Sequence, residues 1–145
     1  MTKKHWYRGK SKETNEWVYG YFVQYGDECY IFEQTEVNKG IDFGGYLDCC
    51  CMTEVIPETI GEFINLTDKN GTEIFEGDLV GHSYGWSSRA SIYQVEWRNE
   101  SCGFEPFSDS CENCGHCGGG LRNKDSVVIG NVHDNPELLE KLSTR

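Results

Sequence analysis

The feature that most constrains the fold is the spacing of the apolar residues, which fall at every second position over most of the chain. A period of two places successive side chains on opposite faces of a β-strand, whereas an amphipathic helix needs a period of about 3.6. In residues 17–25 the odd positions are Trp, Tyr, Tyr, Val and Tyr, and the even positions include Val18 and Phe22. We therefore predict a central strand there, with residues 29–32 as its hairpin partner after a turn at Gly26.

A second hairpin is predicted around the turn sequence Asp68-Lys69-Asn70-Gly71, which residues 62–66 and 73–75 flank. Its Asn and Gly can take positive φ with little strain, which a tight connection between two strands requires. A further turn is predicted at Gly77, followed by another strand.

Two more strands are predicted toward the C-terminus. Residues 91–97 place Tyr93, Val95 and Trp97 on one face and Gln and Glu on the other, which is typical of a half-buried antiparallel strand. Residues 127–129 are predicted to form a short buried strand. Residues 35–53 are interrupted by glycines and weakly patterned, so they predict a loop or a bulged edge.

The last segment has helical spacing instead. Asp134-Asn135-Pro136-Glu137 offers an N-cap, a proline at the first position and an acid in the first turn, and leucines follow at 138, 139 and 142. A helix this short is stable only when it docks on the sheet. The predicted fold is thus mainly β, an antiparallel barrel-like or sandwich-like sheet with a short C-terminal helix. It forms a single domain over residues 1–145, with a Cys- and Gly-rich loop at about 102–120.

The charge of the chain disfavours nucleic acid as a partner. Its 13 Lys and Arg residues stand against 24 Asp and Glu residues, so the formal net charge is −11. Most of such a surface repels a phosphate backbone. Residues 1–12 are the exception, with five basic and no acidic side chains. We interpret this basic stretch as a solvated segment and keep a nucleic-acid contact there as an alternative.

The N-terminal residues contain no apolar signal region, and no run of about 18 apolar residues exists that would span a membrane. We therefore predict a cytoplasmic protein without a membrane partner. Because cytosolic thiols stay reduced or bind metal, the eight cysteines are interpreted as free thiols or metal ligands.

Three cysteines in one glycine-rich stretch have the spacing of metal ligands. Thiolates three residues apart can converge on one ion, and structural zinc takes four ligands. The predicted set is Cys102, Cys111, Cys114 and Cys117. His116 or one of residues 49–51 is an alternative fourth ligand, and unligated thiols remain the competing interpretation. An iron–sulfur cluster is disfavoured because Gly118-Gly119-Gly120 stands where a further Cys followed by Pro is needed.

We find no arrangement of residues that indicates catalysis. Gly9-Lys10-Ser11 resembles the end of a phosphate-binding loop, but Lys4 stands where the first glycine of that motif belongs. The four histidines are scattered, and no Ser or Cys has an assignable base. The chain is therefore predicted not to be an enzyme.

Four motifs in order resemble one protein family, the YopX family of phage and prophage proteins. They are Trp6-Tyr7-Arg8-Gly9-Lys10 with Glu16-Trp17-Val18-Tyr19-Gly20-Tyr21, Pro57-Glu58-Thr59-Ile60-Gly61, Asp68-Lys69-Asn70-Gly71 through Gly77-Asp78-Leu79-Val80, and Val128-Ile129-Gly130-Asn131 through Asn135-Pro136-Glu137-Leu138-Leu139. The resemblance implies a small, largely β protein of the bacterial cytosol with no established activity. The cysteine-rich segment near residue 111 departs from the family pattern.

The shared motifs have a structural interpretation. Gly71 and Gly77 serve turns, Asp78 bonds the turn backbone and Asn135-Pro136 starts the helix. We predict a phage or prophage accessory protein of YopX type that binds a host or phage protein. The alternatives are a structural-zinc module that contacts nucleic acid through its basic N-terminus, and an enzyme. Self-association is a further hypothesis, since β-sheet edges must be covered or paired.

Native mass spectrometry of protein isolated from its host under reducing conditions tests the metal prediction. A mass increment of one zinc that disappears in Cys114→Ser would establish the cysteine loop as a metal site. A measured mass equal to that of the chain without metal would mean that the four predicted ligands are ordinary thiols.

Overall fold

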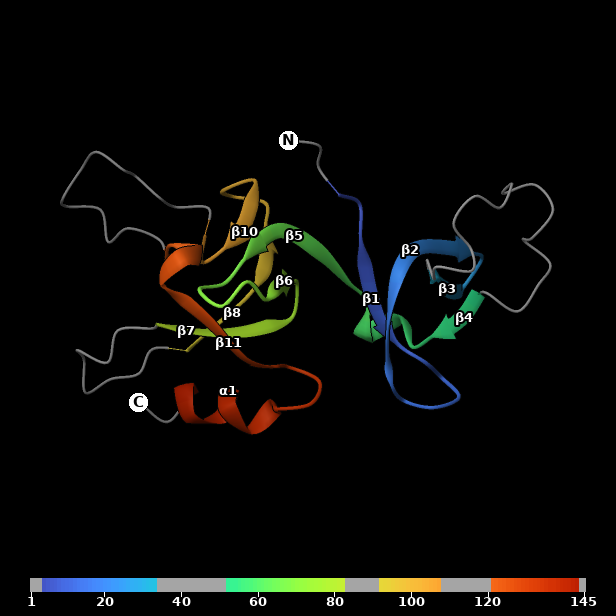
Figure 1. Cartoon of the computed structure of the whole chain (residues 1–145). Helices are drawn as coiled ribbons and strands as arrows, with labels where there is room; N and C mark the ends of the chain where they lie inside the picture. The colour runs from blue at the N-terminus through green and yellow to red at the C-terminus, as the bar shows by residue number, and fades with distance from the viewer. Residues whose placement is uncertain (1–3, 34–51, 83–91, 108–120, 144–145) are drawn as a thin grey trace. The chain divides into compact units, whose positions relative to one another are not determined.

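β-Strands are the main element of the computed structural model, which describes residues 4–33, 52–82, 92–107 and 121–143 (Figure 1). All strand pairs with an assigned register are antiparallel, and the sheets are open. The predicted mainly β fold with one short C-terminal helix is therefore confirmed. The contacts between residues divide the chain into two compact units, Met1–Phe63 and Ile64–Arg145. The prediction of a single domain stays a prediction.

The N-terminal unit is built on one antiparallel sheet. Its elements are β1 (Tyr7–Lys10), β2 (Trp17–Tyr25), β3 (Glu28–Phe32), β4 (Met52–Val55), the 3-10 helix η3 (Pro57–Thr59) and the start of β5 (Gly61–Thr67). The strand order is β4-β3-β2-β1-β5, so β2 has a neighbour on both sides, as predicted for a central strand. The predicted hairpin with β3 is also present, and Gly26 in its turn has a φ of 60°.

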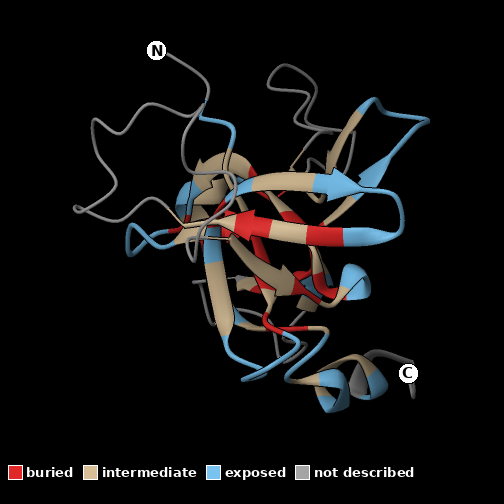
Figure 2. Cartoon of the chain, turned by 90° about the vertical axis from the view of Figure 1, so that its right-hand side faces the viewer, coloured by how far each residue is buried: buried red, intermediate tan, exposed pale blue. Residues whose placement is uncertain are grey.

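The two faces of this sheet differ in character. On the inner face Cys29, Ile31 and Val55 are buried, and neighbouring residues that include Val18 and Phe22 pack against them. Figure 2 shows the alternation along β3, where buried positions are separated by an intermediate one. Val18 and Phe22, at even positions of β2, therefore face the core, and the odd, mostly aromatic positions face away from it.

The sheet curls so that β4 meets the segment that follows β1. The Ile56 N–H donates to the Lys10 carbonyl at 2.8 Å, the Lys12 N–H donates to the Glu54 carbonyl at 3.0 Å, and Ser11 bridges Val55. Gly9 lies at this contact, where a Cβ atom would stand 3.1 Å from two carbon atoms of the Val55 side chain. Gly9 thus permits the close approach that lets the sheet curl.

The C-terminal unit holds smaller sheets and the helix. Its elements are the end of β5, β6 (Glu73–Phe75), β7 (Asp78–His82), β8 (Ile92–Gln94), β9 (Glu96–Arg98), β10 (Gly103–Glu105), the 3-10 helix η4 (Asn123–Asp125), β11 (Ser126–Asn131) and α1 (Pro136–Ser143). β6 is the neighbour of β5, β11-β7-β8 form one sheet, and β10-β9 form another. Helix α1 begins at the predicted proline and contacts β8.

The predicted continuous strand over residues 91–97 is wrong, because the strand breaks at Val95. The Val95 N–H donates to the Asp78 carbonyl and its carbonyl accepts from the Gly77 N–H, both at 2.8 Å. These bonds hold Val95 in the core with Ile74 and Val80, while Tyr93 and Trp97 are exposed.

The predicted strand at residues 127–129 is present, but the prediction that it is buried is wrong, since Val127 and Val128 are half-buried and Ile129 is exposed. β11 is longer than predicted, and its pairing with β7 shifts register between Val128 and Gly130. Such a bulge redirects the side chain within it. Ile129 accordingly lies 41% exposed.

Asp68 joins the β5–β6 turn to β11. Its Oδ1 accepts from the N–H groups of Asn70 at 2.8 Å and Thr72 at 2.9 Å, and its Oδ2 accepts from Val128 at 2.9 Å. Gly71 takes a positive φ of 81°, as predicted, whereas Asn70 does not. Because Asp68 already closes the turn through its side chain, only one residue needs the left-handed conformation.

The outer edge of β11 is closed at further points. The Lys69 N–H donates to the Ser126 carbonyl at 2.9 Å, and the Asn131 N–H donates to Asn135 Oδ1 at 3.2 Å. A Cβ atom on Gly130 would lie 2.8 Å from Asn135 Cγ, so only glycine leaves room for this side chain. The predicted structural role of the Asn135-Pro136 motif is confirmed and extends to the edge of the sheet.

The remaining turn prediction is also confirmed. Gly77 has a φ of 92°, and Asp78 Oδ2 accepts from the Phe75 N–H at 2.8 Å. Asp78 is buried, and this bond gives its carboxylate a backbone donor and fixes the corner that leads into β7.

Gly20→Ala is expected to lower the free energy of unfolding by about 1–3 kcal/mol, the usual cost of overpacking. An added Cβ would overlap the Phe32 carbonyl, whose carbon would be only 2.7 Å away, and backbone cannot give way as a flexible side chain can. Denaturant unfolding measures the loss, with Gln24→Ala at an exposed position of the same strand as the control. Equal, small effects in both variants would contradict the steric argument.

Burial raises the pKa of Asp68, but hydrogen bonds from the backbone N–H groups of Val128, Thr72 and Asn70 outweigh it and hold the pKa below 3.8. A depressed pKa contributes stability that is present above the unfolded-state value and lost as pH falls through the folded-state value. Asp68→Asn is therefore expected to destabilise the protein at neutral pH by about 1–3 kcal/mol, since the Val128 N–H loses its acceptor. The difference from the wild type should shrink below pH 3.8, as measured by unfolding at several pH values. A gap that stays constant with pH, or an equal loss in Asp27→Asn, would refute this role.

Candidate functional site

The outer face of β1 and β2 carries a row of aromatic side chains, which we call the aromatic strip. Its members are Trp6, Trp17, Tyr19, Tyr21 and Tyr25. Three of them are exposed large hydrophobic residues: Tyr19 at 41%, Tyr21 at 39% and Tyr25 at 79%. The Trp6 and Tyr21 rings meet edge to face with centroids 6.0 Å apart. The strip is thus an aromatic surface on a strand whose opposite face is packed in the core.

Basic side chains lie among these rings because of the strand register. Arg8 pairs with Tyr19 and Lys10 with Trp17, which puts the cations on the same face as the aromatic strip. Arg8 Cζ lies 4.5 Å and Lys10 Nζ 5.4 Å from the Trp17 ring centroid. Lys4 Nζ lies 4.3 Å from the Trp6 centroid. Each is within range of a cation–π attraction.

The interpretation of the basic N-terminal stretch as a solvated segment is wrong for residues 7–10. They form β1, and Arg8 is only 6% exposed. A cation this buried must have compensating contacts, and the Trp17 ring supplies one of them. Arg8 and Lys10 therefore belong to the outer face of the sheet and not to a solvated terminus.

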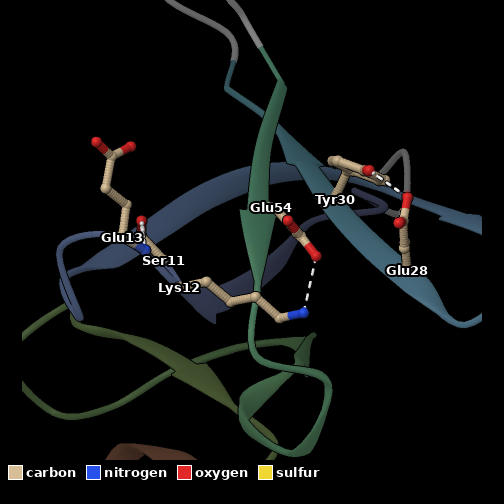
Figure 3. Close-up of polar contacts among 6 residues, drawn as sticks. All are labelled: Ser11, Lys12, Glu13, Glu28, Tyr30 and Glu54. Atoms are coloured by element: carbon tan, nitrogen blue, oxygen red, sulfur yellow. Dashed lines mark hydrogen bonds and ion pairs between the residues drawn. The ribbon is translucent and has the colours of Figure 1, made fainter.

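A polar cluster lies at β3, β4 and the segment after β1 (Figure 3). Lys12 Nζ and Glu54 Oε1 are 2.7 Å apart, and the Tyr30 hydroxyl donates to Glu28 Oε2 at 2.6 Å. Tyr30 pairs with Glu54 across the strands, so the cluster shares the outer face of the sheet. The Glu28 hydrogen bond raises the pKa of Tyr30 to about 12, and bonding to Glu54 raises the pKa of Lys12. Both groups thus keep their protons at neutral pH.

A second aromatic pair lies on the β9–β10 hairpin. The Trp97 and Phe104 rings are 5.2 Å apart in an edge-to-face arrangement, and Trp97 Nε1 donates to Asn99 Oδ1 at 2.9 Å. Phe104 also packs against the core of the C-terminal unit, while Trp97 is exposed.

Of the predicted zinc ligands, only Cys102 lies in the described part of the chain. It is exposed, has a φ of 51° in the β9–β10 turn, and its Sγ donates to the Asn99 carbonyl at 3.3 Å. Cys111, Cys114 and Cys117 lie outside the described residues, as do the alternative ligands His116 and residues 49–51. Within residues 4–33, 52–82, 92–107 and 121–143 no three His, Cys, Asp or Glu side chains gather as a metal site would require. The zinc site stays a prediction.

Sequence reasoning missed the aromatic strip with its cations, although a signal for it exists. Lys4, Trp6, Arg8 and Lys10 occupy alternate positions, which is the strand period. Treating residues 1–12 as a charged terminus concealed that alternation.

These features define a small, mainly antiparallel β protein with an aromatic, cation-bearing sheet surface. Residues 6–140 match the YopX protein family, and the chain belongs to this family. The match contains all four motifs that suggested the family, and their glycines, Asp68, Asp78 and Asn135 have the structural contacts described above.

Among solved structures, the chain is similar to the crystal structure of protein EF1440 from Enterococcus faecalis. The two share 21% sequence identity and a TM-score of 0.51, over 95% of this chain and 99% of the other. At this identity the likeness shows the fold alone. None of the curated proteins compared with the chain matches it.

The helices in the described part of the chain are all too short or too polar to cross a membrane.

Proposed function

We propose that this protein is a phage or prophage accessory protein that acts by binding a protein of the host or the phage, and that the aromatic strip is its binding surface. The observation that carries the proposal is the exposure of Tyr19, Tyr21 and Tyr25 along one face of β2. Tyr and Trp are enriched in protein interfaces because they offer large contact area at low entropic cost. The proposed place of action is the cytosol of a bacterial host, where the cysteines stay reduced or bind metal.

The direction of the pKa shifts supports binding over catalysis. A general acid or base works best with a pKa near the operating pH. The pKa values of Lys12 and Tyr30 are raised and that of Asp68 is lowered, so all three move away from neutrality. Asp68 is also occupied by backbone N–H groups, which gives it a structural task.

The rigidity of the strip supports the same function. β2 pairs with β1 over Trp17–Gly20 and with β3 over Tyr21–Tyr25, and its core face is packed. Aromatic side chains on such a support lose little conformational freedom when a partner docks. Such a preorganised surface gains affinity without a conformational change of the protein.

Affinity capture from host lysate tests the proposal. The double variant Tyr21→Thr/Tyr25→Thr removes two exposed rings, while threonine preserves the preference for a strand. We expect one protein to be enriched on the wild type and reduced at least tenfold on the variant, as quantified by mass spectrometry, because interface aromatics carry much of the binding energy.

The matched control is Tyr93→Thr, which removes an exposed strand tyrosine of the C-terminal unit. It should leave capture unchanged. Equal capture by the wild type and the double variant, with equal melting temperatures, would overturn the assignment of the strip. The absence of any enriched protein on the wild type would overturn the proposed function itself.

A further inference from the structure

We infer that the aromatic strip receives a short acidic segment of the partner protein, laid in extended form along β2. This inference rests on the proposed function and adds the chemistry of the partner. It follows from the charges on the two paired strands and from the charges that surround them.

The outer face of β1 and β2 reverses the sign of the chain. The protein as a whole has a formal net charge of −11. The even positions from 4 to 10 hold Lys4, Arg8 and Lys10, and the odd positions from 17 to 25 hold no carboxylate. The β1–β2 register brings Arg8 and Lys10 to the face of Tyr19 and Trp17. Lys4 lies over the Trp6 ring, which in turn meets the Tyr21 ring. An acidic ligand is therefore attracted to this face and repelled by most of the remaining surface.

The rings hold the cations in place. Lys10 lies over Trp17, and Lys4 lies over both Trp6 and Phe63, at 4.3 Å and 5.9 Å from their centroids. A lysine already restrained by a ring loses less side-chain entropy when a carboxylate arrives. Arg8 is buried and so contributes its positive potential, whereas the exposed Lys4 is suited to direct contact.

The length of the cationic region limits the ligand. Exposed carboxylates flank it at both ends: Glu13 and Glu16 lie in the β1–β2 connection, Asp27 lies in the β2–β3 turn, and Glu28 begins β3 opposite Tyr25. A nucleic acid strand carries one phosphate per nucleotide and would meet these carboxylates wherever it left the strip. A peptide can confine its acidic residues to the strip, which favours a protein segment.

The geometry also sets the orientation of the segment. From Tyr19 to Tyr25 the strand rises about 20 Å, at about 3.3 Å per residue, and an extended peptide of about six residues matches this length. β2 pairs with β1 over Trp17–Gly20 and with β3 over Tyr21–Tyr25, and the side chains of the strip project from the outer face of this pairing. The segment therefore lies on that face along β2, with apolar side chains against the tyrosine rings and carboxylates beside the lysines.

Fluorescence anisotropy with the full chain tests the inference. The probe is a labelled peptide of alternating glutamate and valine, and the comparison probe replaces each glutamate by glutamine. We expect the acidic peptide to bind and to weaken as salt rises, since exposed charges are screened. Lys4→Gln/Lys10→Gln should weaken it on the order of tenfold, and Lys4→Arg/Lys10→Arg should restore it.

The control variant Lys69→Gln/Lys124→Gln removes the same charge from exposed positions of the C-terminal unit. It should change the affinity far less than the strip variant does. Equal binding of the glutamine peptide, or equal loss in both lysine variants, would overturn the inference. Tighter binding of a short oligothymidylate, lost in Lys4→Gln/Lys10→Gln, would replace the acidic segment with nucleic acid.

Capture of the partner from lysate separates the two proposals. If the wild type and Lys4→Gln/Lys10→Gln capture the same protein equally while Tyr21→Thr/Tyr25→Thr does not, the strip binds a partner that is not acidic. The proposed function then stands and the acidic segment is wrong. The melting temperature of every variant is measured as well. Values near that of the wild type show that a loss of binding comes from the changed surface and not from unfolding.

Discussion

The register of β1 against β2 is the constraint on which the N-terminal unit depends. Arg8 opposite Tyr19 and Lys10 opposite Trp17 place every cation of β1 on the outer face and leave Gly9 on the inner one. A slip of one residue would either carry Arg8 into the core or expose Val18 and Phe22. The inner face permits no such slip, because Val55 occupies the space where only a glycine fits. One pairing therefore determines both the packing of the core and the charge of the surface.

The burial of Arg8 connects the stability of the sheet with its proposed binding role. Burial of the Arg8 guanidinium, which is only 6% exposed, costs desolvation energy. The cation–π contact with the Trp17 ring offsets part of this cost. The same contact restrains the Trp17 ring within the strip. Arg8 thus makes the aromatic strip more rigid and gives it a permanent positive electrostatic potential.

Elements with strong local signals could be predicted from the sequence. The bounds of β2, the turns at Gly26, Gly71 and Gly77, and the start of α1 at Pro136 follow from alternation, glycine and proline, which act within a few residues. The break at Val95 could not be predicted, because its cause is the distant corner at Gly77 and Asp78. The outward turn of Ile129 likewise depends on a bulge against another strand. For the aromatic strip the sequence holds part of the signal, the alternation of Lys4, Trp6, Arg8 and Lys10, but the surface itself arises only when β1 pairs with β2.

The closed outer edge of β11 has a consequence for the behaviour of the protein in concentrated solution. Asp68, Lys69 and Asn135 occupy backbone groups that would otherwise be offered to a neighbouring chain. A strand whose edge is already satisfied is a poor template for amyloid-like stacking. Protonation of Asp68 in acid would release the Val128 N–H. Asp68 therefore both closes the β5–β6 turn and protects the edge of the sheet against fibril growth.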